Sequence, residues 1–366
     1  MHKKIILAIA LYALSPAVSN AGEWNYDFFG KSHTLYGYSD YDSNNRASES
    51  HNHFPTRLSA GAMAQYAFND DYQLGLYLDL AYGIDQQLKD YNHGSWGEQI
   101  YGVLDSPYGK FILGQSYNAA YQLSVGAPTI DVLGINQSDI VNFIANPNWQ
   151  RNRKGTAYRK LNSTDINTDG TAPKITYISP EFNNGTMYGL SYVPESYSRD
   201  GLINSQASYK DSAGYIAALS HTADVFGFSL SGSLGAAYYE DNDYETSLGL
   251  SAYRKGWTLG GSLRRTWKDG KINRPIRKFV PDYDAYRDSW AADAGIGYEF
   301  GPFKTALTYF YAKADCKDYS SEIYQWENSY QYNKHLVFNA AVARGKFDSD
   351  IDNAGYAYII GADIKF

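Results

Sequence analysis

The sequence has few of the residues that stabilise small secreted folds or interrupt extended chains. Its 366 residues include one cysteine, Cys316, three methionines and 11 prolines. A single cysteine excludes an intramolecular disulfide framework. After residue 21 no stretch is long and apolar enough for a transmembrane helix, and the mean hydropathy is −0.47. These absences argue against a disulfide-stabilised scaffold and against a helical membrane protein.

Aromatic residues and glycine are abundant instead. The chain contains 36 Tyr, 16 Phe, 7 Trp and 33 Gly. This composition fits a membrane β-barrel, because every second residue of a barrel strand faces lipid and the lumen can be polar. The formal net charge of −7 argues against nucleic acid as a partner.

The first 21 residues are typical of a secretory signal peptide. A basic start is followed by an apolar run from Ile5 to Leu14 and by a small-residue site that ends at Ala21. We therefore expect a cleavable signal peptide over 1–21 and one barrel domain over 22–366. Loss of Lys3 and Lys4 would take the net charge from −7 to −9.

The last twelve residues, Gly355–Phe366, alternate with a period of two. One face carries aromatic residues near both ends and aliphatic residues between them: Tyr356, Tyr358, Ile360, Ala362, Ile364 and Phe366. This arrangement is typical of a strand that spans a bilayer, whose ends lie in the two interfaces. The runs 72–82, 226–238 and 290–300 alternate in the same way.

The alternation predicts about sixteen strands, a closed antiparallel transmembrane barrel of the all-β class. We expect them at 33–41, 56–68, 72–83, 96–104, 110–117, 173–182, 186–193, 212–222, 226–240, 244–254, 257–267, 289–300, 303–313, 322–332, 335–346 and 355–366. Short turns, among them 223–225, 255–256 and 301–302, alternate with long polar loops such as 118–172. The short turns would lie on the periplasmic side.

The order of several segments resembles the general diffusion porins of Gram-negative outer membranes. They are TRLSAGAMAQYAF at 56–68, KFILGQSYNAAYQL at 110–123, KITYISPEFNNGTMYGLSYVPES at 174–196 and the terminal Phe strand. The resemblance covers 22–366 and implies a homotrimer of sixteen-stranded barrels in the cell outer membrane. It also implies a water-filled channel for passive diffusion of small hydrophilic solutes and ions, in contact with outer-membrane lipid and lipopolysaccharide.

The resemblance implies that the third long loop folds into the barrel and narrows the pore. Residues 118–172 are the longest loop and follow the fifth predicted strand. Within it, Ser138–Ala145 is predicted as a short helix with Ser138 as N-cap. The alternative is that the loop lies outside the barrel as a receptor for other molecules.

The resemblance implies further charges at the constriction, because enteric members of this family oppose acidic groups on the loop to a ladder of arginines on the wall. By position, Asp131 and Asp139 are the candidate acids and Arg57 is the candidate wall base. Lys174, which opens the sixth strand, and Arg264, which has lumen parity, are further candidates for the constriction. The fourth and fifth strands lack the further arginines of the family. The basic residues within 151–160 either rebuild a positive wall or form a solvated outer face.

No arrangement of residues predicts an enzyme, a cofactor site or a metal site. The acidic stretch 348–353 lacks the glycine and the glutamate that a calcium loop of the EF-hand type requires, so we interpret it as an external loop. Two other functions remain open. One is a sugar-specific channel with an aromatic track, because Tyr77 and Tyr253 have lumen parity. The other is an adhesin or structural anchor with a plugged barrel.

Overall fold

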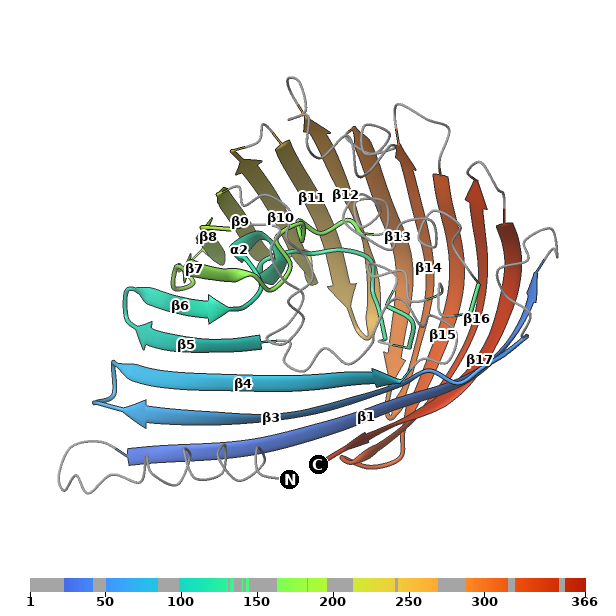
Figure 1. Ribbon diagram of the computed structural model, residues 1–366, viewed down its shortest axis with the longest axis horizontal. Helices are drawn as coiled ribbons and strands as arrows, with labels where there is room; N and C mark the ends of the chain where they lie inside the picture. Colours follow the sequence, from blue (N-terminus) through green and yellow to red (C-terminus); the bar gives the residue numbers. More distant parts are fainter. Residues whose placement is uncertain are drawn as a thin grey trace.

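The described strands of the protein form a closed antiparallel β-barrel (Figure 1). The computed structural model describes residues 23–41, 51–84, 99–130, 132–134, 140, 143–144, 163–182, 184–195, 213–240, 243–268, 288–314, 320–348 and 353–366. These residues contain one helix, α2 (Ala119–Gln122). Among them, no helix is long and apolar enough to cross a membrane.

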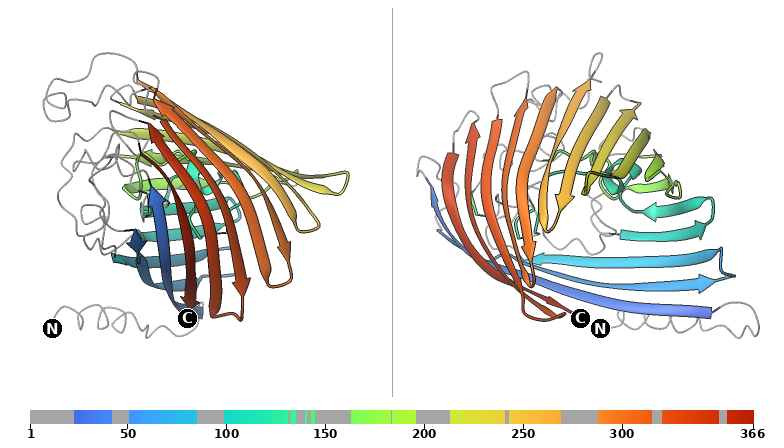
Figure 2. Two further views of the ribbon diagram at one scale, coloured as in Figure 1. Left: turned by 90° about the vertical axis from the view of Figure 1, so that its right-hand side faces the viewer. Right: turned by 180° about the vertical axis from the view of Figure 1, so that it is seen from behind.

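Each strand pairs with its neighbours in the chain, and the first strand pairs with the last. The strands are β1 (Glu23–Tyr41), β2 (Asn52–His53), β3 (Thr56–Ala67), β4 (Gln73–Ile84), β5 (Gln99–Ser106), β6 (Gly109–Gln115), β7 (Pro173–Ile178), β8 (Thr186–Val193), β9 (Gly214–Val225), β10 (Phe228–Tyr239), β11 (Asp243–Arg254), β12 (Trp257–Lys268), β13 (Ser289–Phe300), β14 (Phe303–Ala314), β15 (Ser320–Gln331), β16 (Leu336–Asp348) and β17 (Asn353–Lys365). Figure 2 shows the curved sheet from the side and from behind.

Strand β1 closes the barrel. Its residues 31–41 pair with β17, and its residues 23–34 pair with β3. The C-terminal Phe366 exchanges two backbone hydrogen bonds with Gly30, at N···O distances of 2.7 and 3.0 Å. Closure removes the exposed edges that an open sheet would present to lipid.

Strands β2 and β3 form one interrupted strand. The pairing of β2 with β1, at Gly37↔His53, continues the register of the β1–β3 pairing, at Thr34↔Thr56. Pro55 lies at the break and has no N–H to donate, although its carbonyl still accepts from the amide of Leu35 at 3.0 Å. The seventeen strands therefore amount to sixteen barrel strands, which confirms the predicted number.

Several predicted boundaries were wrong for local reasons. β1 begins at Glu23 and not at 33. The prediction missed its first half because the adjacent aromatic residues Phe28 and Phe29 disturb the period-two alternation. β7 ends at Ile178 rather than 182, shortly before Pro180. The turn expected at 223–225 lies instead at Phe226–Gly227, with φ of 53° and 78°. Positive φ at both positions is typical of the type I′ hairpin turn.

The outer face carries two rows of aromatic rings with apolar residues between them. The first row has one ring on each of five neighbouring strands, with centroid separations of 5.4, 6.4, 5.1 and 5.7 Å: Tyr192, Tyr215, Tyr238, Tyr244 and Trp267. The second row lies at the tight-turn end and includes Trp257, Tyr298, Phe300, Phe303 and Tyr330. Between the rows, Leu250 and Leu259 are each 62% exposed. This is the surface that a barrel presents to a bilayer.

The inner face carries small and polar residues on the same strands. On β13, for example, Asp293 is buried while its outward neighbour Ile296 is 42% exposed. Two buried apolar clusters lie on the inner side, and both include residues from the segment between β6 and β7.

The closed backbone ladder predicts heat-dependent migration in SDS electrophoresis. Unheated protein should migrate as a compact band, and boiling should slow it, because a closed barrel has no free edge at which its strands can begin to separate. Identical migration of heated and unheated protein would contradict a closed barrel.

Leu250→Arg, near the middle of the lipid face, should cost about 2 to 4 kcal/mol of stability and lower the transition temperature.

Candidate functional site: the inner wall and the β6–β7 segment

Residues 116–172, here named the β6–β7 segment, leave the barrel wall after β6 and return to it at β7. The outgoing part begins with α2, whose N-cap Asn118 accepts a hydrogen bond from the amide of Tyr121 at 2.9 Å. Figure 1 shows the described parts of this segment inside the curve of the sheet, between α2 and the strands β10–β14.

Backbone amides of the outgoing part donate to side chains on the inner wall. The acceptors lie on β8, β10, β13 and β15, so they follow the wall in order. The pairs are Ala119 N to Ser191 Oγ (2.8 Å), Val125 N to Ser233 Oγ (2.9 Å), Ala127 N to Asp293 Oδ1 (2.9 Å) and Leu133 N to Glu327 Oε1 (2.6 Å). These bonds satisfy amides that would otherwise be buried without a partner.

Glycines on the wall provide the room for this close approach. A Cβ added at Gly249 would overlap the carbonyl oxygen of Val125, and one at Gly260 would overlap that of Gly126. On β13, a Cβ at Gly297 would lie 3.1 Å from the ring of Pro128. The backbone of the segment therefore lies directly against the backbone of β11 and β12, and the ring of Pro128 lies against β13.

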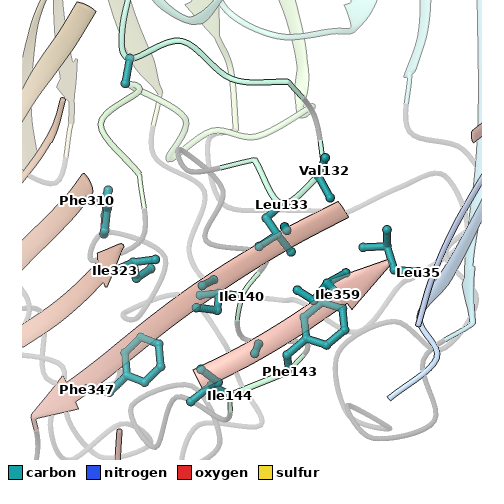
Figure 3. Packing of buried hydrophobic residues seen from close by; sticks show 14 of the residues in the cluster. Leu35, Val132, Leu133, Ile140, Phe143, Ile144, Phe310, Ile323, Phe347 and Ile359 are labelled. Atoms are coloured by element: carbon teal, nitrogen blue, oxygen red, sulfur yellow. The ribbon is translucent and has the colours of Figure 1, made fainter. Parts of the chain in front are cut away.

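Further along, apolar side chains of the segment pack on β1 and on the last strands. Ile140, Phe143 and Ile144 belong to a buried cluster that also contains Leu35, Phe310, Phe347 and Ile359 (Figure 3). The amides of Phe143 and Ile144 donate to the carbonyl of Ile140 at 2.9 and 2.8 Å, which forms a turn within the predicted helix 138–145. The predicted N-cap, Ser138, lies outside the described residues.

Two buried ion pairs lie against the returning part of the segment. Lys174 Nζ lies 3.0 Å from Asp169 Oδ2, and both side chains are completely buried. Arg264 Nη2 lies 2.8 Å from Glu245 Oε2, at 1% and 0% exposure. Arg264 also donates to the hydroxyl of Thr168 at 3.0 Å. Buried charges of this kind are stable only when paired. The Lys174–Asp169 pair joins the segment to β7, whereas the Arg264–Glu245 pair lies within the wall and reaches the segment through Thr168.

Lys174 and Arg264 therefore lie in a different environment from the one we expected. Both have the predicted inward parity, but the structure buries them beneath the returning part of the segment and pairs each with a carboxylate. Sequence parity identifies the face of a strand and says nothing of what covers that face. These two side chains bond residues of the segment, Asp169 and Thr168, and are not exposed to solutes.

Arg57 is exposed, and it pairs in register with His33 of β1 and Gly83 of β4. It lies on the face of β3 opposite to Leu58, which is the predicted lumen parity. Asp131, Asp139 and the basic stretch 151–160 lie outside the described residues. Their predicted roles stay predictions.

Opposite the segment, the inner wall carries a row of stacked aromatic rings. Phe29 stacks on Tyr77 at 5.7 Å between centroids, and Tyr77 stacks on Tyr101 at 4.8 Å. The interplanar angles are 25° and 24°, so the ring faces are turned toward each other. Rings in this arrangement leave few open faces on which a sugar could stack.

Asp165 is an ionisable group of the returning part that lies outside the membrane-spanning strands. Burial, together with the charge of Asp293, raises the pKa of Asp165 to about 6. A hydrogen bond with Ser124 and the charge of Arg264 oppose these effects. The protonation state of Asp165 therefore changes within an accessible pH range.

Sequence analysis did not assign roles to the wall carboxylates that hold the segment. Glu245, Asp293 and Glu327 are each buried on the inner face. A usable signal did exist on β13, where Asp293 is the single charge among the small inward residues Ala291, Gly295 and Gly297. A lone carboxylate in such surroundings needs hydrogen-bond donors from another part of the chain.

Comparisons with known proteins agree with this architecture. A family model described as Gram-negative porin matches residues 7–350. No match was found among curated proteins. Among solved structures, the anion-selective porin from Comamonas acidovorans aligns with a TM-score of 0.60 at 13% identity, covering 94% of this chain and 100% of that one.

Two further structures show the same fold. OmpF of Salmonella typhi, in a complex with daunomycin, aligns with a TM-score of 0.60 at 15% identity, over 93% of this chain and 97% of that one. The trimer form of OmpT from Vibrio cholerae aligns with a TM-score of 0.60 at 14% identity, over 95% and 100%. At these identities the structures establish the fold, and the family match covers nearly the whole chain. The chain belongs to the Gram-negative porin family, whose members form channels for passive diffusion across the outer membrane.

Proposed function

We propose that this chain is an outer-membrane diffusion channel whose narrowest part lies between the β6–β7 segment and the inner wall of β3–β5 and of residues 23–34 of β1. The observation that carries the proposal is the row of hydrogen bonds from Ala119, Val125, Ala127 and Leu133 to the wall between β8 and β15. A segment held there occupies part of the cross-section, and solutes pass on the other side.

Small hydrophilic solutes and ions would then be the permeants, and no catalytic residue is needed. The wall opposite the segment carries the carboxylate of Asp79 as well as the bases Lys31 and Arg57. This wall therefore has no strong excess of positive or negative charge. The loop acids Asp131 and Asp139 then decide whether cations or anions are preferred.

We further propose a homotrimer that is exported by a signal peptide over 1–21 and contacts lipopolysaccharide and lipid through its outer face. The trimer form of OmpT supports this assembly by fold alone. The exposed apolar band between the two aromatic rows supports the lipid contact. In the electrophoresis experiment, a trimer that survives SDS should give an unheated band above the boiled monomer, whereas the compact single barrel should migrate below it.

Removing the centre of the segment should widen the channel. We expect deletion of residues 129–146 to raise single-channel conductance by about twofold or more, because conductance follows the open cross-section. A deletion of 271–286, between β12 and β13, is the control and should leave conductance near the native value. Unchanged conductance in a folded 129–146 variant would place the constriction elsewhere.

The channel should prefer cations mildly. The zero-current potential across a KCl gradient measures this preference. The double change of Asp131→Asn and Asp139→Asn should shift the potential toward anions, because charges in a narrow lumen are weakly screened. Asp348→Asn, at the outer end of β16, removes a charge outside the constriction and is the control. An anion preference in the native channel would contradict the proposal.

Docking of the returning part should strengthen as the pH falls. Because the docked segment raises the pKa of Asp165 to about 6, it holds this proton more tightly than the undocked segment does. The added stability is complete below the usual pKa near 4 and is lost as the pH rises through 6. Protection from hydrogen exchange in 163–172, corrected for the intrinsic rate, should be about tenfold greater at pH 5 than at pH 7.5. Asp165→Asn should abolish the difference, and equal protection of the native protein at both pH values would contradict the assignment.

A further inference from the structure

One side chain of the wall hydrogen-bonds both the outgoing and the returning part of the segment. Asp293, on the inner face of β13, is 5% exposed. Its Oδ1 accepts from the amide of Ala127 at 2.9 Å, and its Oδ2 accepts from the hydroxyl of Thr164 at 2.6 Å. Ala127 belongs to the outgoing part and Thr164 to the returning part.

The carboxylate is also anchored to the wall itself. The amide of Ser262, on the neighbouring β12, donates to Asp293 Oδ1 at 2.8 Å. The hydroxyl of Ser262 lies 2.7 Å from both Asp293 Oδ2 and Thr164 Oγ1. Both carboxylate oxygens thus have donors from the wall as well as from the segment.

The surroundings of Asp293 allow the segment to come this close. Gly295 and Gly297 follow it on the same face, and the ring of Pro128 lies against them, 3.3 and 3.1 Å from where their Cβ atoms would be. Larger side chains there would push Pro128, and with it Ala127, away from the carboxylate. The other wall contacts described above each hold one part of the segment: Glu327 bonds Leu133, and Arg264 bonds Thr168.

We propose that Asp293 is the positioning residue of the constriction. It joins the two parts of the β6–β7 segment to one point of the wall, and this fixes how far the segment extends toward β3–β5. This inference rests on the proposed function, because the position of the segment sets the channel width only if solutes pass beside it. Hydrogen bonds to a carboxylate are about twice as strong as neutral ones, so a charge-neutral replacement of the same shape should loosen both parts together.

The test compares three folded variants with the native protein. The measurement is hydrogen exchange in the peptides 119–128 and 163–170. Asp293→Asn should raise exchange in both peptides by about tenfold, the effect of weakening a buried charged hydrogen bond. Thr164→Val removes only the donor on the returning part and should raise exchange in 163–170 alone. Asp363→Asn is the matched control. It makes the same change at a buried inward carboxylate, whose partners Lys31 and His33 lie on β1, and both peptides should exchange as in the native protein.

Single-channel recordings of the same variants in planar bilayers complete the test. Asp293→Asn should broaden the distribution of conductance and raise its mean, while Asp363→Asn should match the native width. If Asp293→Asn behaves like Asp363→Asn in exchange or in conductance, the positioning role is wrong. If the native protein forms no channel, the proposed function fails instead, whatever exchange shows. Asp293→Ala, which removes all the acceptors, should exceed Asp293→Asn in both measurements wherever it folds, and a smaller effect would contradict the assignment.

Discussion

The pairing of β1 with β17 is the constraint on which the rest of the structure depends. Hydrocarbon offers no partner to a backbone amide or carbonyl, so a sheet in a bilayer is stable only when it has no open edge. Here β1 pairs over 31–41 with β17 and over 23–34 with β3, and Phe366 adds two bonds to Gly30. Once the barrel is closed, every strand must send alternate side chains to lipid and to the interior.

The interior also has to hold the β6–β7 segment, whose buried backbone groups need hydrogen-bond partners. The wall does so with acceptors where amides arrive, such as Ser233 and Asp293, and with glycines where backbone meets backbone, such as Gly249 and Gly260. Near β1 and β17 the contact is apolar, through Phe143 and Ile359. The segment is thus fixed by hydrogen bonds along one half of the wall and by packing at the far end.

Much of the barrel could be predicted from the sequence because the period-two alternation is local. The sixteen strands, the outward aromatic rows and the inward parity of Arg57 follow from that pattern alone. Two of the wrong boundaries depend on single residues. Pro180 shortens β7, and positive φ at Phe226 shifts a turn to a place where no Asn-Gly or Asp-Gly pair marks it.

By itself, the sequence determined the class of fold, the number of strands and the face on which each side chain lies, because those properties depend on neighbours along the chain. The tertiary structure alone decided which inward charges are covered. Lys174 and Arg264 share inward parity with Arg57, yet the returning part of the segment buries the first two against Asp169 and Glu245 and leaves Arg57 exposed. The reason is that burial on the inner face depends on contacts between residues far apart in sequence, which no local pattern encodes.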